Sequence, residues 1–152
     1  MGIEKDILQS KFRNEYQKAA VNLIYTYNWL QERMKVFFSK HDITAQQFNI
    51  LRILRGANTA LSTLQIRQRM LDKMSDTSRI VDRLVIKGLV KKKINKTDKR
   101  LVDVVITEKG KKTLQHIDLY EQEMDETMKS LNLSDAKVLN QLLDKLRSSD
   151  KY

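Results

Sequence analysis

The chain contains no cysteine and no proline, and only 4 of its 152 residues are glycine. Without cysteine, the protein cannot form disulfides, bind a metal through thiolates or sense oxidants through a thiol. Since proline and glycine are the residues that disfavour helix interiors most, their scarcity permits long, uninterrupted helices. Apolar residues make up 41% of the chain and charged residues 32%. This balance is typical of a folded, helix-rich protein rather than of a disordered chain.

Long apolar runs and catalytic motifs are also missing. No stretch approaches the roughly 18 consecutive apolar residues of a membrane span, and the N-terminus has no apolar signal region. We therefore expect a cytoplasmic protein without a membrane partner. The only two histidines, His41 and His116, fall on different predicted elements. Because no metal-ligand spacing, glycine-rich phosphate loop or nucleophile motif is present, we expect no enzyme activity, no metal site and no cofactor.

Positive charge is concentrated in one third of the chain. The formal net charge is +10, and residues 63–112 hold 15 Lys and Arg against 6 Asp and Glu, a net of +9. The remaining residues together carry a net of +1. A localised basic region is typical of a protein that binds a polyanion, whereas charge that only confers solubility is usually less segregated.

The start of the chain is predicted to be one long helix over residues 7–38. A helix of this length exposes more apolar surface than a small domain covers by itself, so we expect a second chain to cover it and predict a homodimer. The apolar residues recur at alternating steps of four and three, as in a coiled coil: Tyr16, Ala20, Leu23, Tyr27, Leu30, Met34 and Phe37.

The middle of the chain has the pattern of a winged helix-turn-helix. Two capping boxes, Thr44 with Gln47 and Ser62 with Gln65, predict the starts of two short helices. A third short helix ends at a glycine, and two strands rich in Val and Ile follow it. The predicted ranges are helices 45–55, 63–70 and 76–87, ended by Gly88, and strands 89–95 and 100–106.

A second long helix is predicted over residues 108–131, capped by Thr107. A last helix is predicted to be capped by Ser134 and to run through Leu146. The predicted fold class is therefore mainly α with a small β-wing, a winged helix-turn-helix with long terminal dimerisation helices. We expect one domain over residues 1–152. Its dimerisation helices lie at about 1–40 and 108–152, and its DNA-binding lobe at about 44–107.

The third short helix has one apolar and one polar face. An α-helix fits the major groove of DNA, and its N-terminal residues reach the base edges. Ser75 and Ser78 are small enough for a close approach, and Arg79 can fork onto a guanine or clamp a phosphate. The alternative interpretation is an ordinary amphipathic helix whose polar face is only solvated, because such a helix has the same pattern. The inward residues are Thr77, Ile80, Val81 and Leu84, and the outward ones are Ser75, Ser78, Arg79, Asp82 and Arg83.

The turn between the two strands carries Lys96, Lys99 and Arg100 around a single acid, Asp98. DNA phosphates attract cations, and a narrow minor groove attracts an inserted arginine or lysine. A short aspartate can accept bonds from backbone amides in the turn or orient an arginine two residues later. We predict a wing tip that meets DNA, with Asp98 holding Arg100 in place.

Residues 78–110, SRIVDRLVIKGLVKKKINKTDKRLVDVVITEKG, resemble the MarR family of bacterial winged-helix transcription regulators. The matching features are an arginine in the recognition helix, Asp-Arg-Leu, a Gly-Leu-Val turn into the wing, Asp-x-Arg at its tip and a Thr-x-x-Gly helix start. The resemblance implies a homodimer on a palindromic operator in double-stranded DNA, more commonly as a repressor than as an activator.

Carried over by position, the resemblance places Ser78 and Arg79 in the recognition helix and Asp98 and Arg100 in the wing. It also implies that Asp82 can pair with the wing arginine. Lys92 departs from the family pattern, because many members have an arginine there.

Many members of the family bind a small phenolic or anionic molecule between the dimerisation helices and the DNA-binding lobe. Here Trp29, Arg33 and Phe48 would form an apolar pocket with one cation for such an effector. The same aromatic side chains also fit a role in the core or in the dimer interface.

Two other functions fit a winged helix. A sequence-nonspecific architectural DNA-binding protein needs the same charge but no fixed spacing between two recognition helices, whereas long dimerisation helices favour a fixed spacing. If the winged helix were instead a protein-interaction module, we would expect its recognition face to be neutral or mixed in charge, whereas this face is basic. The sequence therefore favours a sequence-specific regulator.

Overall fold

The computed structural model describes residues 2–148 and confirms the predicted fold class, a mainly helical protein with one small antiparallel sheet. The chain divides into two compact units, Met1–Asp118 and Leu119–Tyr152. Residues 149–152, the end of the predicted C-terminal dimerisation segment, lie outside the described residues. Among the described helices, none is both long and apolar enough to cross a membrane.

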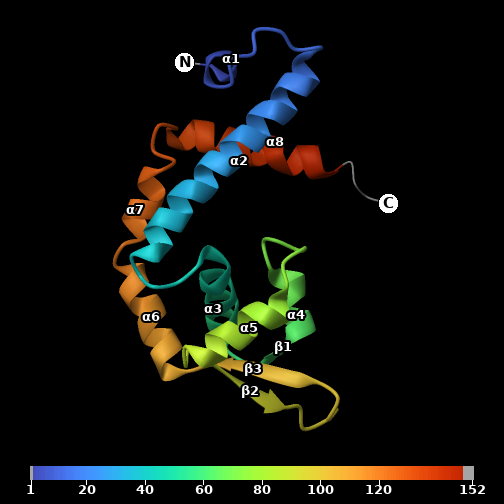
Figure 1. The fold of residues 1–152 in the computed structure, drawn as a ribbon, viewed down its shortest axis with the longest axis vertical. Helices are drawn as coiled ribbons and strands as arrows, with labels where there is room; N and C mark the ends of the chain where they lie inside the picture. The colour runs from blue at the N-terminus through green and yellow to red at the C-terminus, as the bar shows by residue number, and fades with distance from the viewer. Residues whose placement is uncertain (1, 149–152) are drawn as a thin grey trace. The chain divides into compact units, whose positions relative to one another are not determined.

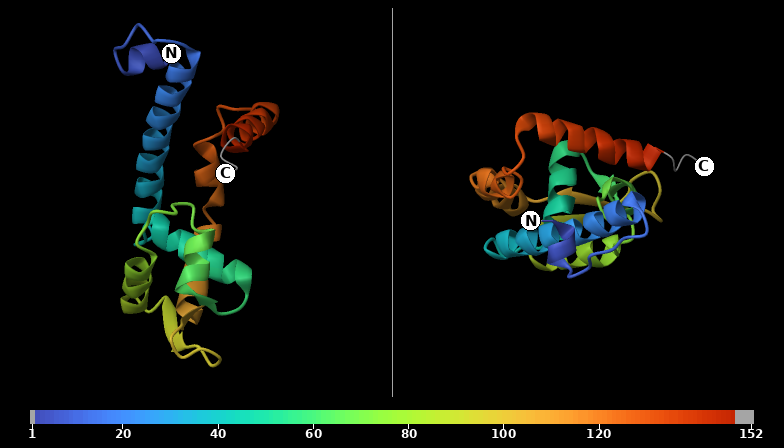
Figure 2. Two further views of the ribbon diagram at one scale, coloured as in Figure 1. Left: turned by 90° about the vertical axis from the view of Figure 1, so that its right-hand side faces the viewer. Right: turned by 90° about the horizontal axis from the view of Figure 1, so that it is seen from above.

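The first unit contains a long helix, several shorter helices and the sheet (Figure 1). In chain order its elements are α1 (Ile3–Asp6), α2 (Glu15–Ser39), α3 (Ala45–Ala57), β1 (Leu61–Ser62), α4 (Thr63–Arg69), α5 (Thr77–Ile86), β2 (Val90–Ile94), β3 (Val102–Ile106) and α6 (Glu108–Asp118). Helices α3, α4 and α5 gather beside the sheet at one end of α2, and α1 lies at the other end (Figure 2).

The prediction of one helix from residue 7 is wrong over residues 7–14. Helix α2 begins only at Glu15, because Asn14 caps it: the Asn14 side chain accepts a hydrogen bond from the backbone N–H of Gln17 at 2.9 Å. The Gln17 side chain in turn accepts from the backbone N–H of Arg13 at 2.6 Å. As an N-cap residue, Asn14 itself has extended backbone, with φ −165° and ψ 176°, so the helix does not continue toward the N-terminus.

The predicted coiled-coil seam lies on α2, and most of it faces solvent. Phe37 is the one buried member of the seven. At the other end of the helix Tyr16 is 86% exposed, and Tyr27 is 56% exposed. A large apolar stripe on a single helix is unusual on the surface of a monomer.

Three predicted helix starts are confirmed. Thr44 and Ser62 each form both halves of a capping box, and the Thr107 hydroxyl accepts from the backbone N–H of Gly110 at 3.1 Å. The predicted end of the third short helix is confirmed as well. Gly88 has a φ of 72°, a left-handed conformation that glycine adopts without strain, and it turns the chain from α5 into β2.

The core of the first unit takes side chains from every element around the sheet. Arg55 of α3 and Asp118 of α6 add a two-pronged ion pair, with N–O distances of 2.7 and 3.2 Å. Because α3, α4, α5, α6 and both long strands contribute to one core, the position of α5 relative to the wing is fixed by packing. The most deeply buried side chains are Ile50, Leu51, Ile66, Val81, Leu84, Val90, Val104, Leu114 and Ile117.

The sheet is antiparallel, with the strand order β1-β3-β2. Val90 pairs with Ile106 and Ile94 with Val102, so the apolar side chains of the wing share one face. Only the base of the wing is buried, because Ile94 near the tip is 70% exposed. Strand β1 was not predicted, since it has only two residues and overlaps the cap of α4.

The second unit differs from the prediction at two points. The expected helix over residues 108–131 is wrong: α6 and α7 are separate helices, and Tyr120 between them has non-helical backbone, with φ −112° and ψ 13°. The last helix is capped by Asn132 instead of Ser134, because the Asn132 side chain accepts from the backbone N–H of Asp135 at 2.8 Å. The elements of this unit are α7 (Glu121–Glu126) and α8 (Leu133–Arg147).

Gly110 lies where no side chain fits. A Cβ atom there would lie 2.3 Å from the backbone oxygen of Leu89 and 2.7 Å from the Ile106 side chain. Gly110→Ala must therefore push α6 away from the base of the wing, and we expect it to lower the free energy of unfolding by about 1–3 kcal/mol. Urea denaturation measures the change.

Gly56→Ala in α3 is the matched control, since a Cβ atom there meets nothing within 4 Å. Alanine in a helix is more favourable than glycine, so this substitution should raise the free energy of unfolding by about 0.5–1 kcal/mol. Equal effects at the two glycines would contradict the expectation.

Candidate nucleic-acid interface

Helix α5 has a free polar face because its apolar face is fixed in the core. The residues predicted to point inward are buried: Thr77, Ile80, Val81 and Leu84. The residues predicted to point outward on the helix are exposed: Ser78, Arg79, Asp82 and Arg83. Ser75, just before the helix, is half-buried, and its hydroxyl donates to the backbone oxygen of Asp72 at 2.8 Å. Ser75 therefore supports the turn into α5.

The start of α5 is set by residues that the sequence analysis did not single out. Asp76 is the N-cap, and its side chain accepts from the backbone N–H of Arg79 at 3.2 Å. The preceding loop is held by Asn49, a buried side chain of α3 that accepts from the backbone N–H of Leu71 at 3.0 Å. An aspartate directly before an amphipathic run is a recognised cap signal, so Asp76 was detectable from sequence.

The end of α5 is held by two lysines. Lys87 donates from Nζ to the backbone oxygen of Asp42 at 2.6 Å and to the side chain of Gln47 at 3.2 Å. Lys109 of α6 donates to the backbone oxygen of Lys87 at 2.9 Å. Both ends of α5 are thus tied to neighbouring elements, and the helix presents its polar face in a defined orientation.

An ion pair joins α5 to the wing. Asp82 on the helix pairs with Lys92 on β2. The resemblance implied that Asp82 can pair with the wing arginine, but Arg100 has a different partner. Both members of the pair are exposed to solvent, so its contribution to stability is small. It links the polar face of the helix to the wing strand, whose position is already fixed by packing in the core.

At the wing tip Asp98 holds Arg100 by three hydrogen bonds. The Asp98 carboxylate accepts from the backbone N–H of Arg100 at 3.0 Å, from Nε at 3.0 Å and from Nη2 at 3.1 Å. The side-chain bonds and then the backbone bond from Arg100 lower the pKa of Asp98, and the Asp98 bond raises the pKa of Arg100. The Arg100 side chain is 89% exposed. The bonds from Asp98 therefore orient a guanidinium that remains accessible to a ligand.

A second side chain organises the same turn. Asn95 accepts from the backbone N–H groups of Thr97 and Asp98, both at 2.9 Å. Its Nδ2 donates to both carboxylate oxygens of Asp103 on β3, each at 3.1 Å. An Asn that bonds to an amide two residues later is a common turn pattern, so this role could have been found from sequence. Its contact with Asp103 depends on the strand register and could not.

Further cations surround the two features. Lys96 and Lys99 are exposed at the tip, as a wing that meets a polyanion requires. Lys91 and Lys93 alternate with Lys92 along β2 and therefore lie on the opposite face of the sheet, away from α5. The sequence analysis also passed over two exposed arginines at the end of α4, Arg67 and Arg69.

The three predicted effector residues divide into two contacts. The Arg33 guanidinium lies 4.5 Å from the centre of the Trp29 ring, a cation–π contact on α2. Phe48 packs against Phe38, with ring centroids 4.6 Å apart. Phe48 therefore contributes to the packing of α2 on α3.

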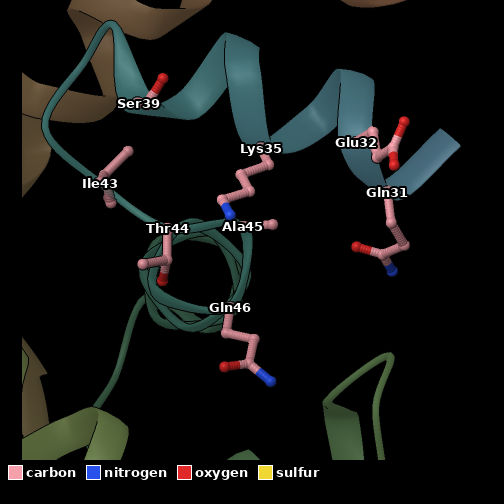
Figure 3. A pocket seen from close by; sticks show the side chains of 8 residues that line it. All are labelled: Gln31, Glu32, Lys35, Ser39, Ile43, Thr44, Ala45 and Gln46. Atoms are coloured by element: carbon pink, nitrogen blue, oxygen red, sulfur yellow. The ribbon is translucent and has the colours of Figure 1, made fainter. Parts of the chain in front are cut away.

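A cavity of about 460 Å³ lies between the end of α2 and the start of α3. Lys35 extends across it toward the first residues of α3 (Figure 3). None of the three predicted effector residues lines this cavity. Its lining residues are Gln31, Glu32, Lys35, Ser39, Ile43, Thr44, Ala45 and Gln46.

The two histidines, predicted on different elements, have ring centroids 5.6 Å apart, with His41 following α2 and His116 on α6. Within residues 2–148 no group of three or more His, Cys, Asp or Glu side chains could hold a metal ion.

The arrangement combines two capped short helices, a third helix with an exposed polar face and a hairpin with an oriented arginine at its tip. This is a winged helix-turn-helix, whose geometry suits a helix in the major groove and a wing beside it.

Comparisons with known proteins give the family. The sequence model of the MarR family matches residues 41–101. The apo form of MarR from E. coli is 31% identical, with a TM-score of 0.64 over 82% of this chain and 93% of that chain. The chain therefore belongs to the MarR family of transcription regulators.

Two further structures resemble the chain. A cysteine-to-serine mutant of E. coli MarR complexed with operator DNA is 28% identical, with a TM-score of 0.79 over 90% of this chain and 99% of that chain. An organohalide-sensing transcriptional regulator in a 2,4-dichlorophenol-bound form is 19% identical, with a TM-score of 0.81 over 93% and 87%, and shares the fold. No curated protein matches the chain.

The Asp98 carboxyl is expected to titrate below the ordinary aspartate range in the native protein. Bonds from Arg100 favour the charged form, so the folded pKa is lowered. The resulting stability is present above the ordinary pKa of about 4 and is lost as the pH falls through the folded pKa. An NMR titration of the carboxyl carbon measures this. In Arg100→Ala the pKa should return toward its ordinary value, and an unchanged pKa would contradict the assignment.

Proposed function

We propose that the protein is a homodimeric, sequence-specific transcriptional repressor that binds a palindromic operator in the bacterial cytoplasm. The observation that carries the proposal is the pairing of two DNA-directed features in one unit. These are the exposed polar face of α5 and the Arg100 side chain that Asp98 orients at the wing tip. Repression follows if the bound dimer blocks RNA polymerase at the promoter.

Helix α5 would lie in the major groove. Ser78 and Arg79 occupy its first turn, the part of a recognition helix that reaches base edges, and Ser75 lies just before it. Arg79 would read a base, and Arg83, one turn later, would contact bases or phosphates. The residues of the apolar face cannot contact DNA, because they are buried in the core.

The wing would lie along the neighbouring minor groove. Lys96, Lys99 and Arg100 supply its positive charge, and Arg100 is the side chain best placed to enter the groove. Asp98 orients Arg100 directly, and Asp82 holds the wing strand through Lys92. The two acids would therefore act on DNA only through the cations that they position.

Two exposed apolar surfaces support the homodimer. The first is the coiled-coil seam of α2, of which most side chains are exposed. The second is a stripe on α8, where Val138, Leu142 and Leu146 recur every four residues and are exposed. We propose a single MarR-like domain in which residues 1–40 and 108–152 form the dimerisation segments and residues 44–107 form the DNA-binding lobe.

A closed dimer would present its two recognition helices at a fixed distance. Half-sites one helical turn apart, about 34 Å, are the usual match for a dimeric helix-turn-helix protein. A mutant of E. coli MarR that is 28% identical to this chain has been solved in complex with operator DNA, which supports an operator as the target.

A small phenolic or anionic molecule is the proposed effector. The cavity between α2 and α3 has a volume suited to such a ligand and carries the cation of Lys35 at its wall. Trp29, Arg33 and Phe48 remain the alternative binding residues, with an aromatic ring and a guanidinium already in contact. In either case the ligand would act by favouring one of two lobe spacings.

Fluorescence anisotropy on two duplexes tests the proposal. One duplex carries the DNA directly upstream of the protein's own gene, and the other is a shuffled control of equal length and composition. Titration at two salt concentrations separates base reading from phosphate attraction. We expect clear preference for the upstream duplex and a steep salt dependence on both. Equal binding would favour the architectural protein, and no binding at low salt would favour the protein-interaction module.

Substitution of Arg79 and substitution of Arg100 should weaken DNA binding in different ways. Arg79→Ala should cost about 1–3 kcal/mol on the upstream duplex and relax the preference at one operator position, because it removes a base contact. Arg100→Ala should weaken binding to both duplexes and flatten the salt dependence, because it removes a contact to the backbone or minor groove. The same anisotropy titrations measure both. An equal loss on both duplexes for Arg79→Ala would instead make Arg79 a phosphate contact.

Leu142→Glu should convert the dimer into monomers, because it places a charge in the proposed apolar interface. Sedimentation equilibrium measures the mass. Asn140→Glu adds the same charge at an exposed position on the other side of α8 and should leave the dimer intact. A dimer that survives Leu142→Glu would show that α8 is not part of the interface.

A further inference from the structure

The Asn95 amide is bonded on both of its sides. Its oxygen accepts from the backbone N–H groups of Thr97 and Asp98, both at 2.9 Å, and its nitrogen donates to Asp103 at 3.1 Å. Strand alternation places Asn95 and Asp103 on the solvent side of the wing, away from α5. Neither residue packs into the core, so their bonds serve the turn itself.

The hydrogen bonds of Asn95 and those of Asp98 are connected through the backbone of Asp98. Asn95 fixes the backbone N–H of Asp98, the Asp98 carboxylate holds Arg100, and the Asp98 carbonyl accepts from the backbone N–H of Leu101 at 3.0 Å. The carbonyl of Leu101 then accepts from the backbone N–H of Asn95 at 3.0 Å. The turn is a closed ring of hydrogen bonds, with Arg100 projecting from it.

Order at the tip has a consequence for affinity. An exposed turn without these bonds would sample many conformations, and binding would have to select one of them. Ordering a flexible loop or a long side chain on binding lowers affinity, and a turn already ordered in the free protein avoids this loss. Arginine is among the side chains with the most rotamer freedom to lose.

We propose that Asn95 and Asp103 are positioning residues for the Arg100 contact with DNA. They preset the turn in which Asp98 holds Arg100, so that the guanidinium enters the minor groove already oriented. The inference rests on the proposed function. Neither residue is required to touch DNA, and both act through Arg100.

Three variants that keep the net charge of the protein but differ in the hydrogen bonding of the turn test the proposal. Asn95→Ala removes both sets of bonds without changing the charge, and we expect it to weaken binding to the upstream duplex roughly tenfold. The exchanged pair Asn95→Asp with Asp103→Asn also keeps the net charge. It restores the bonds with donor and acceptor reversed and should bind within about threefold of the wild type. Thr97→Ala, at the same turn, removes only an exposed side chain and is the control.

The effect must also depend on Arg100. In an Arg100→Ala background, Asn95→Ala should cause no further loss, because the group that it positions is gone. An equal loss in both backgrounds, or an exchanged pair as weak as Asn95→Ala, would overturn the proposal. If Arg100→Ala weakens binding and Asn95→Ala does not, only this proposal fails. If the wild type does not prefer the upstream duplex and Arg100→Ala changes nothing, the proposed function fails as well.

A readout without DNA completes the test. In the free protein, amide hydrogen exchange at Thr97 and Asp98, measured by NMR, should be about fivefold faster in Asn95→Ala than in the wild type. The exchanged pair should show wild-type exchange rates. Exchange that is unchanged in Asn95→Ala would overturn the proposal, since the turn would then be ordered without Asn95.

Discussion

The burial of one side of α5 is the constraint on which the rest of the winged helix-turn-helix depends. A ten-residue helix is not stable by itself in water, so α5 exists because its apolar side is packed into the core. Val81 and Leu84 are completely buried, and each such side chain contributes about 1.5–3 kcal/mol. The same core takes Val90 and Val104 from the base of the wing. One packing event therefore turns the polar face outward and sets the wing beside it.

The acidic side chains of the basic region complete this arrangement. Residues 63–112 contain 6 acids among 15 cations, and every one of the 6 has a local structural partner. Each acid shapes a turn, caps a helix or orients a cation, and this placement leaves most of the positive charge unpaired. The contacts are Asp72 with the amide of Met74, Asp76 with the amide of Arg79, Asp82 with Lys92, Asp98 with Arg100, Asp103 with Asn95, and Glu108 with Lys111.

Features that depend on short sequence separations were predictable. Capping boxes at Thr44 and Ser62, the two faces of α5 and the strands of the wing all follow from spacings of two to four residues. Asp98 and Arg100 are two residues apart, so their contact could be anticipated. The start of α2 could also have been found, because Asn14 and Gln17 have cap spacing and the apolar series begins only at Tyr16.

Features that depend on tertiary placement were not predictable. The pairing of Asp82 with Lys92 needs the angle between helix and wing, and that of Lys87 with Asp42 joins residues far apart in the chain. Asn95 and Asp103 meet only because of the strand register. The break between α6 and α7 contains no proline or glycine, so composition gave no sign of it.

The separation of the two faces of α5 also bears on how such a protein can diverge. Ser78, Arg79 and Arg83 contact solvent and take no part in the core, so their replacement leaves the packing of the helix unchanged. A duplicated gene could therefore acquire a different target by a few substitutions on this face, without compensating changes elsewhere. In the proposed function, target choice would depend on these three residues, whereas stability depends on the buried residues of the same ten-residue helix.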